Sequence, residues 1–124
     1  MARYFVVFAG GGLGATARYL LSGAVYRFMS SQFPYGTVLV NTLGCFLIGF
    51  LMTFFQERFA VNPELRLFLT IGMLGGFTTF STFSYETIPL IRSGGYMTAS
   101  ANVAYMLLNC LGATWVGGLI GAQF

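Results

Sequence analysis

Long runs without a charged side chain restrict the fold of this chain more than any other feature. Residues 28–56, 67–85 and 93–124 contain no Asp, Glu, Lys or Arg. A helix needs about 20 mostly apolar residues to cross about 30 Å of hydrocarbon, so each run is long enough to span a membrane. The stretch 4–26 is interrupted only by Arg18 and gives a fourth span if Arg18 faces a cavity or a partner.

The composition supports a membrane protein and excludes several other classes. Only 7% of the residues are charged and the mean hydropathy is +0.77, whereas roughly a quarter of a soluble domain is charged. The chain has no His and two Cys, which leaves no zinc or His-metal site and no Ser-His-Asp hydrolase. Its scattered Arg residues do not form the clustered basic face of a nucleic-acid-binding protein. We therefore expect no enzyme and no nucleic-acid partner.

The expected fold is all-α, with one four-helix transmembrane domain over residues 1–124. The predicted spans are about 4–26, 35–56, 65–91 and 96–122. They leave no room for a separate soluble domain. The N-terminus also has some features of a signal peptide, and cleavage would leave three spans. The glycines at 10–12 interrupt its apolar stretch and favour four spans.

The two cysteines, Cys45 and Cys110, both fall in the middle of a predicted span. A structural disulfide is not expected at these positions. We interpret both residues as small, buried apolar side chains.

The arginines outside the spans divide almost evenly between the two sides of the membrane. Short connectors make consecutive spans antiparallel, so Arg3, Arg58 and Arg66 share one side, and Arg27 and Arg92 share the other. The positive-inside rule then gives almost no preferred orientation. Two interpretations stay open. The slight bias fixes one orientation, or the chain inserts both ways and two copies pair about an axis in the membrane plane, as inverted repeats do in larger transporters.

Residues 72–86, GMLGGFTTFSTFSYE, form an unusual segment inside the third span. Gly75-Gly76 followed by aromatic and β-branched residues is poor helix material, which predicts a break near 75–79. Backbone groups released at this depth are tolerated only where they are buried in protein or line a cavity. Carbonyls near Gly75 and Thr78 could then bind a cation such as Na⁺, and oxygen-only ligands exclude a soft transition metal.

The residues after this break favour an anion path. The resuming helix would present hydroxyls from Thr79, Ser81 and Thr82. Phe80 and Phe83 share a helical face, and their ring edges carry partial positive charge, which attracts an anion without trapping it. The alternative is a kinked helix whose hydroxyls bond back to its own carbonyls and whose Phe side chains face lipid.

Polar residues in the other spans would extend such a path. Thr37, Asn41 and Cys45 recur at every fourth residue of the second span, and Asn102 begins a similar stripe in the fourth. The alternative role of such residues is to join helices through hydrogen bonds. Arg18 either snorkels to an interface or lies at a vestibule that collects anions.

Three motifs make the sequence resemble the Fluc fluoride channels, also called the CrcB family. They are GGGLGATARY with Arg18, GTVLVN at 36–41, and GGFTTFSTFSYET at 75–87. The resemblance covers nearly the whole chain. It implies an antiparallel, dual-topology homodimer in the lipid bilayer with two fluoride pores.

The resemblance also implies roles for individual residues. It implies a structural Na⁺, not transported, held by the backbone carbonyls of Gly75 and Thr78 from both subunits. Phe80 and Phe83 would line the pores, and three further residues would contact the ion. These residues are Asn41, Ser81 and Thr82.

Two charged positions and the fourth span complete the comparison with the family. Arg18 matches the arginine of the family's first span, and Glu86 matches its vestibule acid. Relatives have a Ser-rich track in the fourth span, where this chain has Asn102, Met106 and Cys110. Of these three, Asn102 is the candidate for a pore contact.

The expected function is a fluoride-selective channel of the cytoplasmic membrane. Neutral HF crosses membranes and ionises inside the cell, so a passive pore lowers cytoplasmic fluoride, and no ATP-binding motif is present. One alternative is a proton-coupled small multidrug exporter, which uses a Glu in the first span; this chain has none before Glu57. A second alternative is a non-transporting assembly subunit, favoured by the Gly-rich faces.

Overall fold

The computed structural model describes residues 1–58 and 60–124, which form helices joined by short connectors, with no strand among them. The helices are α1 (Ala2–Phe28), α2 (Tyr35–Gln56), α3 (Pro63–Leu67), the π-helical η1 (Phe68–Leu74), α4 (Gly75–Phe77), α5 (Phe80–Arg92) and α6 (Tyr96–Gly121). Four stretches are long and apolar enough to cross a membrane, and α3 to α5 together make the third. The prediction of four spans is therefore confirmed, with ends within two residues of those expected.

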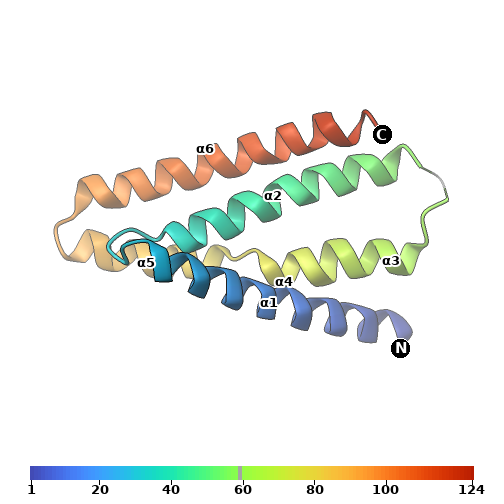
Figure 1. Ribbon diagram of the computed structural model, residues 1–124, viewed down its shortest axis with the longest axis horizontal. Helices are drawn as coiled ribbons and strands as arrows, with labels where there is room; N and C mark the ends of the chain where they lie inside the picture. Colours follow the sequence, from blue (N-terminus) through green and yellow to red (C-terminus); the bar gives the residue numbers. More distant parts are fainter. Residues whose placement is uncertain (59) are drawn as a thin grey trace.

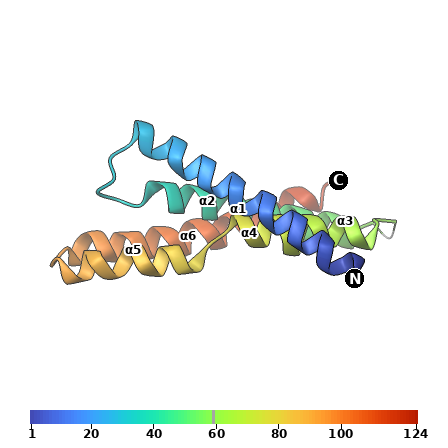
Figure 2. The same ribbon diagram turned by 90° about the horizontal axis from the view of Figure 1, so that it is seen from below.

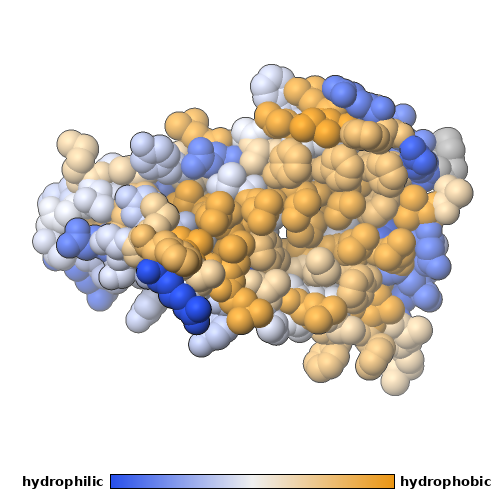
Figure 3. Space-filling model, viewed as in Figure 1, coloured by the Kyte–Doolittle hydropathy of each residue, from blue (hydrophilic) through white to orange (hydrophobic). Residues whose placement is uncertain are grey.

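The ends of the helices gather into two groups. Both chain termini and the connector between α2 and α3 lie at one end of the molecule, and the connectors 29–34 and 93–95 lie at the other (Figure 1). Consequently α2 and α6 run in the same direction, side by side. Apolar side chains cover most of the middle of the molecule, with hydrophilic ones mainly toward its ends (Figure 3). This pattern suits a chain surrounded by lipid.

Glycines bring the backbones of α2 and α6 into direct contact. A Cβ added to Gly49 would overlap the Thr114 carbonyl, and one added to Gly117 would overlap the Phe46 carbonyl. Small residues permit this close packing of membrane helices. The two helices thus pack as one pair with their backbones in contact.

The Gly-rich half of α1 packs in the same way on the third span. A Cβ on Gly14 would overlap the Met73 carbonyl, and one on Gly76 would overlap the Gly11 carbonyl. From this crossing α1 diverges from α5 toward the far end of the molecule (Figure 2). The divergence leaves a hollow between α1, α2 and α5.

The third span stops being helical over two residues. Thr78 has φ −80° and ψ 153°, and Thr79 has φ −151° and ψ 113°, both extended, and α5 begins at Phe80. Gly75 itself is helical, with φ −62° and ψ −38°. The π-helical turn η1 precedes this interruption, and π-helical turns are frequent at functional sites.

Candidate functional site

The side chain of Asn41 on α2 forms hydrogen bonds with both the N–H and the carbonyl of Thr79 at the interruption. Its Nδ2 donates to the Thr79 carbonyl at 2.8 Å, and the Thr79 N–H donates to its Oδ1 at 2.7 Å. Asn41 is only 6% exposed and Thr79 is also buried. Because an unpaired buried backbone group is costly, this double contact stabilises the extended backbone.

These contacts free two carbonyls from helical hydrogen bonding. The Thr79 N–H would close the α-helical bond to the Gly75 carbonyl, but it donates to Asn41. The Thr82 N–H stands in the same relation to the Thr78 carbonyl, but it donates to Thr79 Oγ1 at 3.2 Å. Thr79 is thus the N-cap of α5. The two carbonyls from which the sequence predicted cation binding are released as acceptors.

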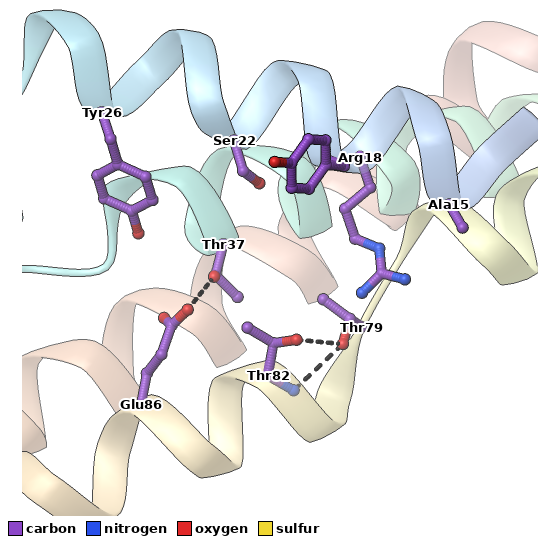
Figure 4. A pocket seen from close by; sticks show the side chains of 9 residues that line it. Ala15, Arg18, Ser22, Tyr26, Thr37, Thr79, Thr82 and Glu86 are labelled. Atoms are coloured by element: carbon purple, nitrogen blue, oxygen red, sulfur yellow. Dashed lines mark hydrogen bonds between the residues drawn. The ribbon is translucent and has the colours of Figure 1, made fainter.

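A hollow of about 360 Å³ opens beside the interruption. It is lined by Ala15, Arg18, Tyr19, Ser22, Tyr26, Thr37, Thr79, Thr82 and Glu86. Arg18 extends from α1 toward Thr79, and Glu86 on α5 faces Thr37 on α2 (Figure 4). Among the described residues, Arg18 Nε and Glu86 Oε2 are buried without a hydrogen-bond partner. The hollow is therefore lined by a guanidinium and a carboxyl group that each have one unpaired polar atom.

Three hydroxyls gather at the start of α5, where the hollow reaches the interruption. Thr79 Oγ1 donates to Thr82 Oγ1 at 2.9 Å and lies 3.3 Å from Ser81 Oγ. The N-terminus of a helix also carries partial positive charge, and helix N-termini bind anions. Of the expected donors, Thr82 lines the hollow together with Arg18, whereas Ser81 is exposed and reaches this region only through its contact with Thr79.

The rings of Phe80 and Phe83 lie next to each other but in different surroundings. Their centroids are 5.3 Å apart and their planes make an angle of 60°. Phe83 is 7% exposed, whereas Phe80 is 72% exposed. A single chain thus covers the Phe83 ring and leaves the Phe80 ring exposed.

Asn102 lies deeper than the sequence indicated and joins α6 to α5. Its side chain is 0% exposed, and its Nδ2 donates to Thr87 Oγ1 at 2.8 Å. The Thr87 hydroxyl donates to the Phe83 carbonyl at 2.7 Å. Two hydrogen bonds, with Thr87 between them, therefore connect Asn102 to the backbone of Phe83. Asn102 does not line the hollow that holds Arg18.

Some site residues were not predicted from the sequence. Ser22 and Tyr26 line the hollow, and their spacing of four from Arg18 along α1 was the available signal. Thr87, which connects Asn102 to Phe83, was also missed. Among the described residues, no group of three or more His, Cys, Asp or Glu could hold a metal ion, so a metal would need other ligands.

The four apolar spans indicate a multi-pass membrane protein, with a polar hollow between its helices beside an interrupted span. Residues 5–118 match the family model described as CrcB-like protein, Camphor Resistance (CrcB), and the chain belongs to this family. The resemblance found from the sequence motifs is therefore confirmed.

Curated relatives are similar over almost the whole chain. One from Geobacter metallireducens is 54% identical over 107 residues, which is 86% of each chain. One from Geotalea uraniireducens is 50% identical over 117 residues, with 94% of this chain and 93% of the relative covered. One from Coxiella burnetii is 46% identical over 119 residues, with 95% and 96% covered. Each is named a fluoride-specific ion channel FluC, which describes a channel and not an enzyme.

Proposed function

We propose that this protein is a fluoride-selective channel that lets F⁻ leave the cytoplasm passively through the cytoplasmic membrane. The observation that carries the proposal is the interrupted third span, where the hydroxyls of Thr79, Ser81 and Thr82 gather at the start of α5. Family membership and the names of the relatives support the same function.

The hollow supplies the entrance of the proposed path. The guanidinium of Arg18 raises the local concentration of anions, because clefts of one charge sign attract counter-ions. Glu86 Oε1 is directed toward α2, because it accepts from the Thr37 hydroxyl at 2.7 Å. An anion entering beside Arg18 therefore meets the hydroxyls first.

The Asn41 amide can donate one N–H to the ion and still keep its hydrogen bonds with the Thr79 backbone. One hydrogen of Nδ2 points to the Thr79 carbonyl at 2.8 Å, and Met106 Sδ lies 3.5 Å from the same nitrogen. A thioether is a weak acceptor. Fluoride is a far stronger acceptor and would replace the sulfur as partner of the second hydrogen.

Conduction then requires weak, repeated contacts. Hydroxyls, one amide and the ring edges of Phe80 and Phe83 replace part of the ion's hydration shell, and none carries a full charge. Binding stays favourable enough for entry and weak enough for release. A membrane potential contributes about 2.3 kcal/mol per elementary charge per 100 mV, so an inside-negative cell expels F⁻ without ATP.

The carbonyls of Gly75 and Thr78 fit a structural Na⁺. Both are neutral, hard oxygen acceptors, and both are deprived of their helical donors by Asn41 and Thr79. A bound Na⁺ would supply the positive charge that offsets these carbonyl dipoles. In this proposal Gly75 and Thr78 hold the ion, and Na⁺ is not transported.

A second copy in the opposite orientation would complete the pore. Phe80 is largely exposed, so one chain leaves one side of this ring uncovered. The almost even division of arginines between the two sides permits opposite insertion. We therefore propose an antiparallel homodimer in which each chain covers the open rings of its partner.

Fluoride efflux from liposomes tests the proposal. A fluoride electrode should record release from vesicles containing the purified protein, without a proton gradient. Phe80→Ile should reduce release toward that of protein-free vesicles, because an aliphatic side chain has no positive ring edge. Phe8→Ile, at an exposed ring of α1, is the matched control and should conduct normally. Vesicles that are tight to F⁻, or that release it only with a proton gradient, would refute the channel.

A further inference from the structure

Three sulfur-containing side chains gather between α2 and α6, outside the hollow. The Cys110 thiol donates to Met106 Sδ at 3.7 Å, and the register of the two helices brings Cys45 opposite Cys110. Both cysteines are free and half-buried. The proposed fluoride path does not use either thiol.

The packing of the parallel helices explains why these residues meet. Asn41 contacts Met106, and four residues further on each helix Cys45 comes opposite Cys110. After another four residues, Gly49 lies against Thr114. Each turn of α2 thus faces one turn of α6, and the glycine contact holds the register. The backbone contact between α2 and α6 therefore determines that Cys45 lies opposite Cys110.

Thiols and thioethers are soft ligands, which select Cu(I) and similar ions over hard cations. We infer that Cys45, Met106 and Cys110 form a binding site for one soft monovalent cation, Cu(I) or Ag(I). One of its three ligands is a methionine thioether, so the site is not a group of His, Cys, Asp and Glu ligands.

The charge balance favours a monovalent ion. When the cation binds, one cysteine S–H bond breaks, the proton leaves to water, and a thiolate–metal bond forms. The second cysteine and Met106 bind as neutral ligands. One positive charge enters and one leaves, so the site stays neutral and avoids the large cost of a buried net charge. Metal binding coupled to proton release is general for thiol ligands.

Occupation of the site would also affect the interrupted span. Met106 Sδ is the acceptor next to Asn41 Nδ2, and Asn41 holds Thr79. A metal on this sulfur occupies the lone pair that now accepts from Asn41, so the amide loses this partner and the geometry that holds Thr79 is disturbed. Fluoride efflux should therefore fall when the site is filled; this consequence, unlike the binding itself, rests on the proposed function.

Silver nitrate in chloride-free buffer is the probe for the site. Native mass spectrometry of the purified protein should show one silver ion per chain, with the mass of one proton lost. Silver should also protect both thiols from a maleimide. Cys110→Ala should weaken silver binding by more than the roughly 10- to 100-fold typical of changes outside a metal's direct ligands.

A methionine pair provides the matched control. Met106→Leu keeps the side-chain volume but removes the thioether, so silver should bind less tightly. Met97→Leu, in the same helix with a side chain that is 84% exposed, should bind silver as the wild type does. Equal affinity in both variants, or unprotected thiols in the wild type, would overturn the site. Silver binding with undiminished fluoride efflux would overturn only the link to conduction.

Discussion

The Thr37 hydroxyl donates a hydrogen bond to Glu86 Oε1 at 2.7 Å and thereby connects α2 to α5 across the hollow. The second carboxylate oxygen, Oε2, is buried without a partner among the described residues. One threonine therefore determines where the negative charge of the hollow lies.

Thr37→Val should release Glu86 from this position. Loss of a hydrogen bond to a buried polar group costs about 1–3 kcal/mol, and the freed carboxylate can turn toward the anion path. We expect lower thermal stability and slower fluoride efflux. Thr37→Ser retains the donor and should behave like the wild type in both measurements. A valine variant with normal stability and efflux would show that the hydrogen bond has no role.

Asn41→Ala should destabilise the interrupted span. The Thr79 N–H would lose its partner inside the protein, at about 1–3 kcal/mol, and the Thr79 carbonyl would lose one of its donors. Thermal unfolding in detergent should report the loss, and efflux should fall with it. Asn109→Ala, at an exposed asparagine of α6, is the control and should unfold like the wild type. If the two variants unfold alike, Asn41 does not hold the interruption.

Gly14→Ala should weaken the packing of α1 on the third span. The new Cβ would overlap the Met73 carbonyl, and overpacking costs about 1–3 kcal/mol. Gly12→Ala is a matched control on the same helix, because a Cβ there meets nothing within 4 Å. Alanine is the better helix former by up to about 1 kcal/mol. Thermal unfolding should therefore shift in opposite directions, and a parallel shift would contradict this packing.

Replacement of Na⁺ by a large organic cation should reduce fluoride efflux. The released carbonyls of Gly75 and Thr78 would lose the cation that offsets their dipoles, and a large cation cannot approach them closely. Efflux should return when Na⁺ is added back, and the liposome assay can follow both steps. Full activity in the absence of Na⁺ would exclude a structural role for the ion.

The four spans could be predicted from the sequence because their signal is local. Charge-free runs fix their lengths, and turn-forming residues such as Pro34 and the Asn62-Pro63 pair fix their ends. In the structure the Asn62 side chain accepts from the Glu64 N–H at 2.8 Å and caps α3. Helix length and capping depend on residues that are close in the sequence, so both can be predicted from a single sequence.

The residues at which the third span leaves the helix could not be predicted as accurately from the sequence. Local propensity predicted a break near 75–79 but did not indicate which of these residues leave the helix: Gly75 is helical, and the extended residues are Thr78 and Thr79. Asn41, far away in the sequence, supplies the donor and acceptor that make Thr79 extended. Gly76 instead allows contact with Gly11 of α1. Both roles depend on tertiary contacts that helix propensity does not describe.

The same limit applies to the polar stripes. Thr37 and Asn41 were found because a spacing of four marks one helical face. The stripe could not show which neighbour that face meets. Asn102 has a similar pattern, but it binds Thr87 instead of lining the hollow.

The glycine contacts between α2 and α6 also fix the axial register of the two helices. Gly49 meets the Thr114 backbone and Gly117 meets the Phe46 backbone, so even a small slide of one helix along the other would press a side chain against the opposite backbone. Asn41 therefore stays opposite Met106 of α6. In the proposed channel, α2 and α6 would act as one wall, because neither helix can shift past the other without breaking these backbone contacts.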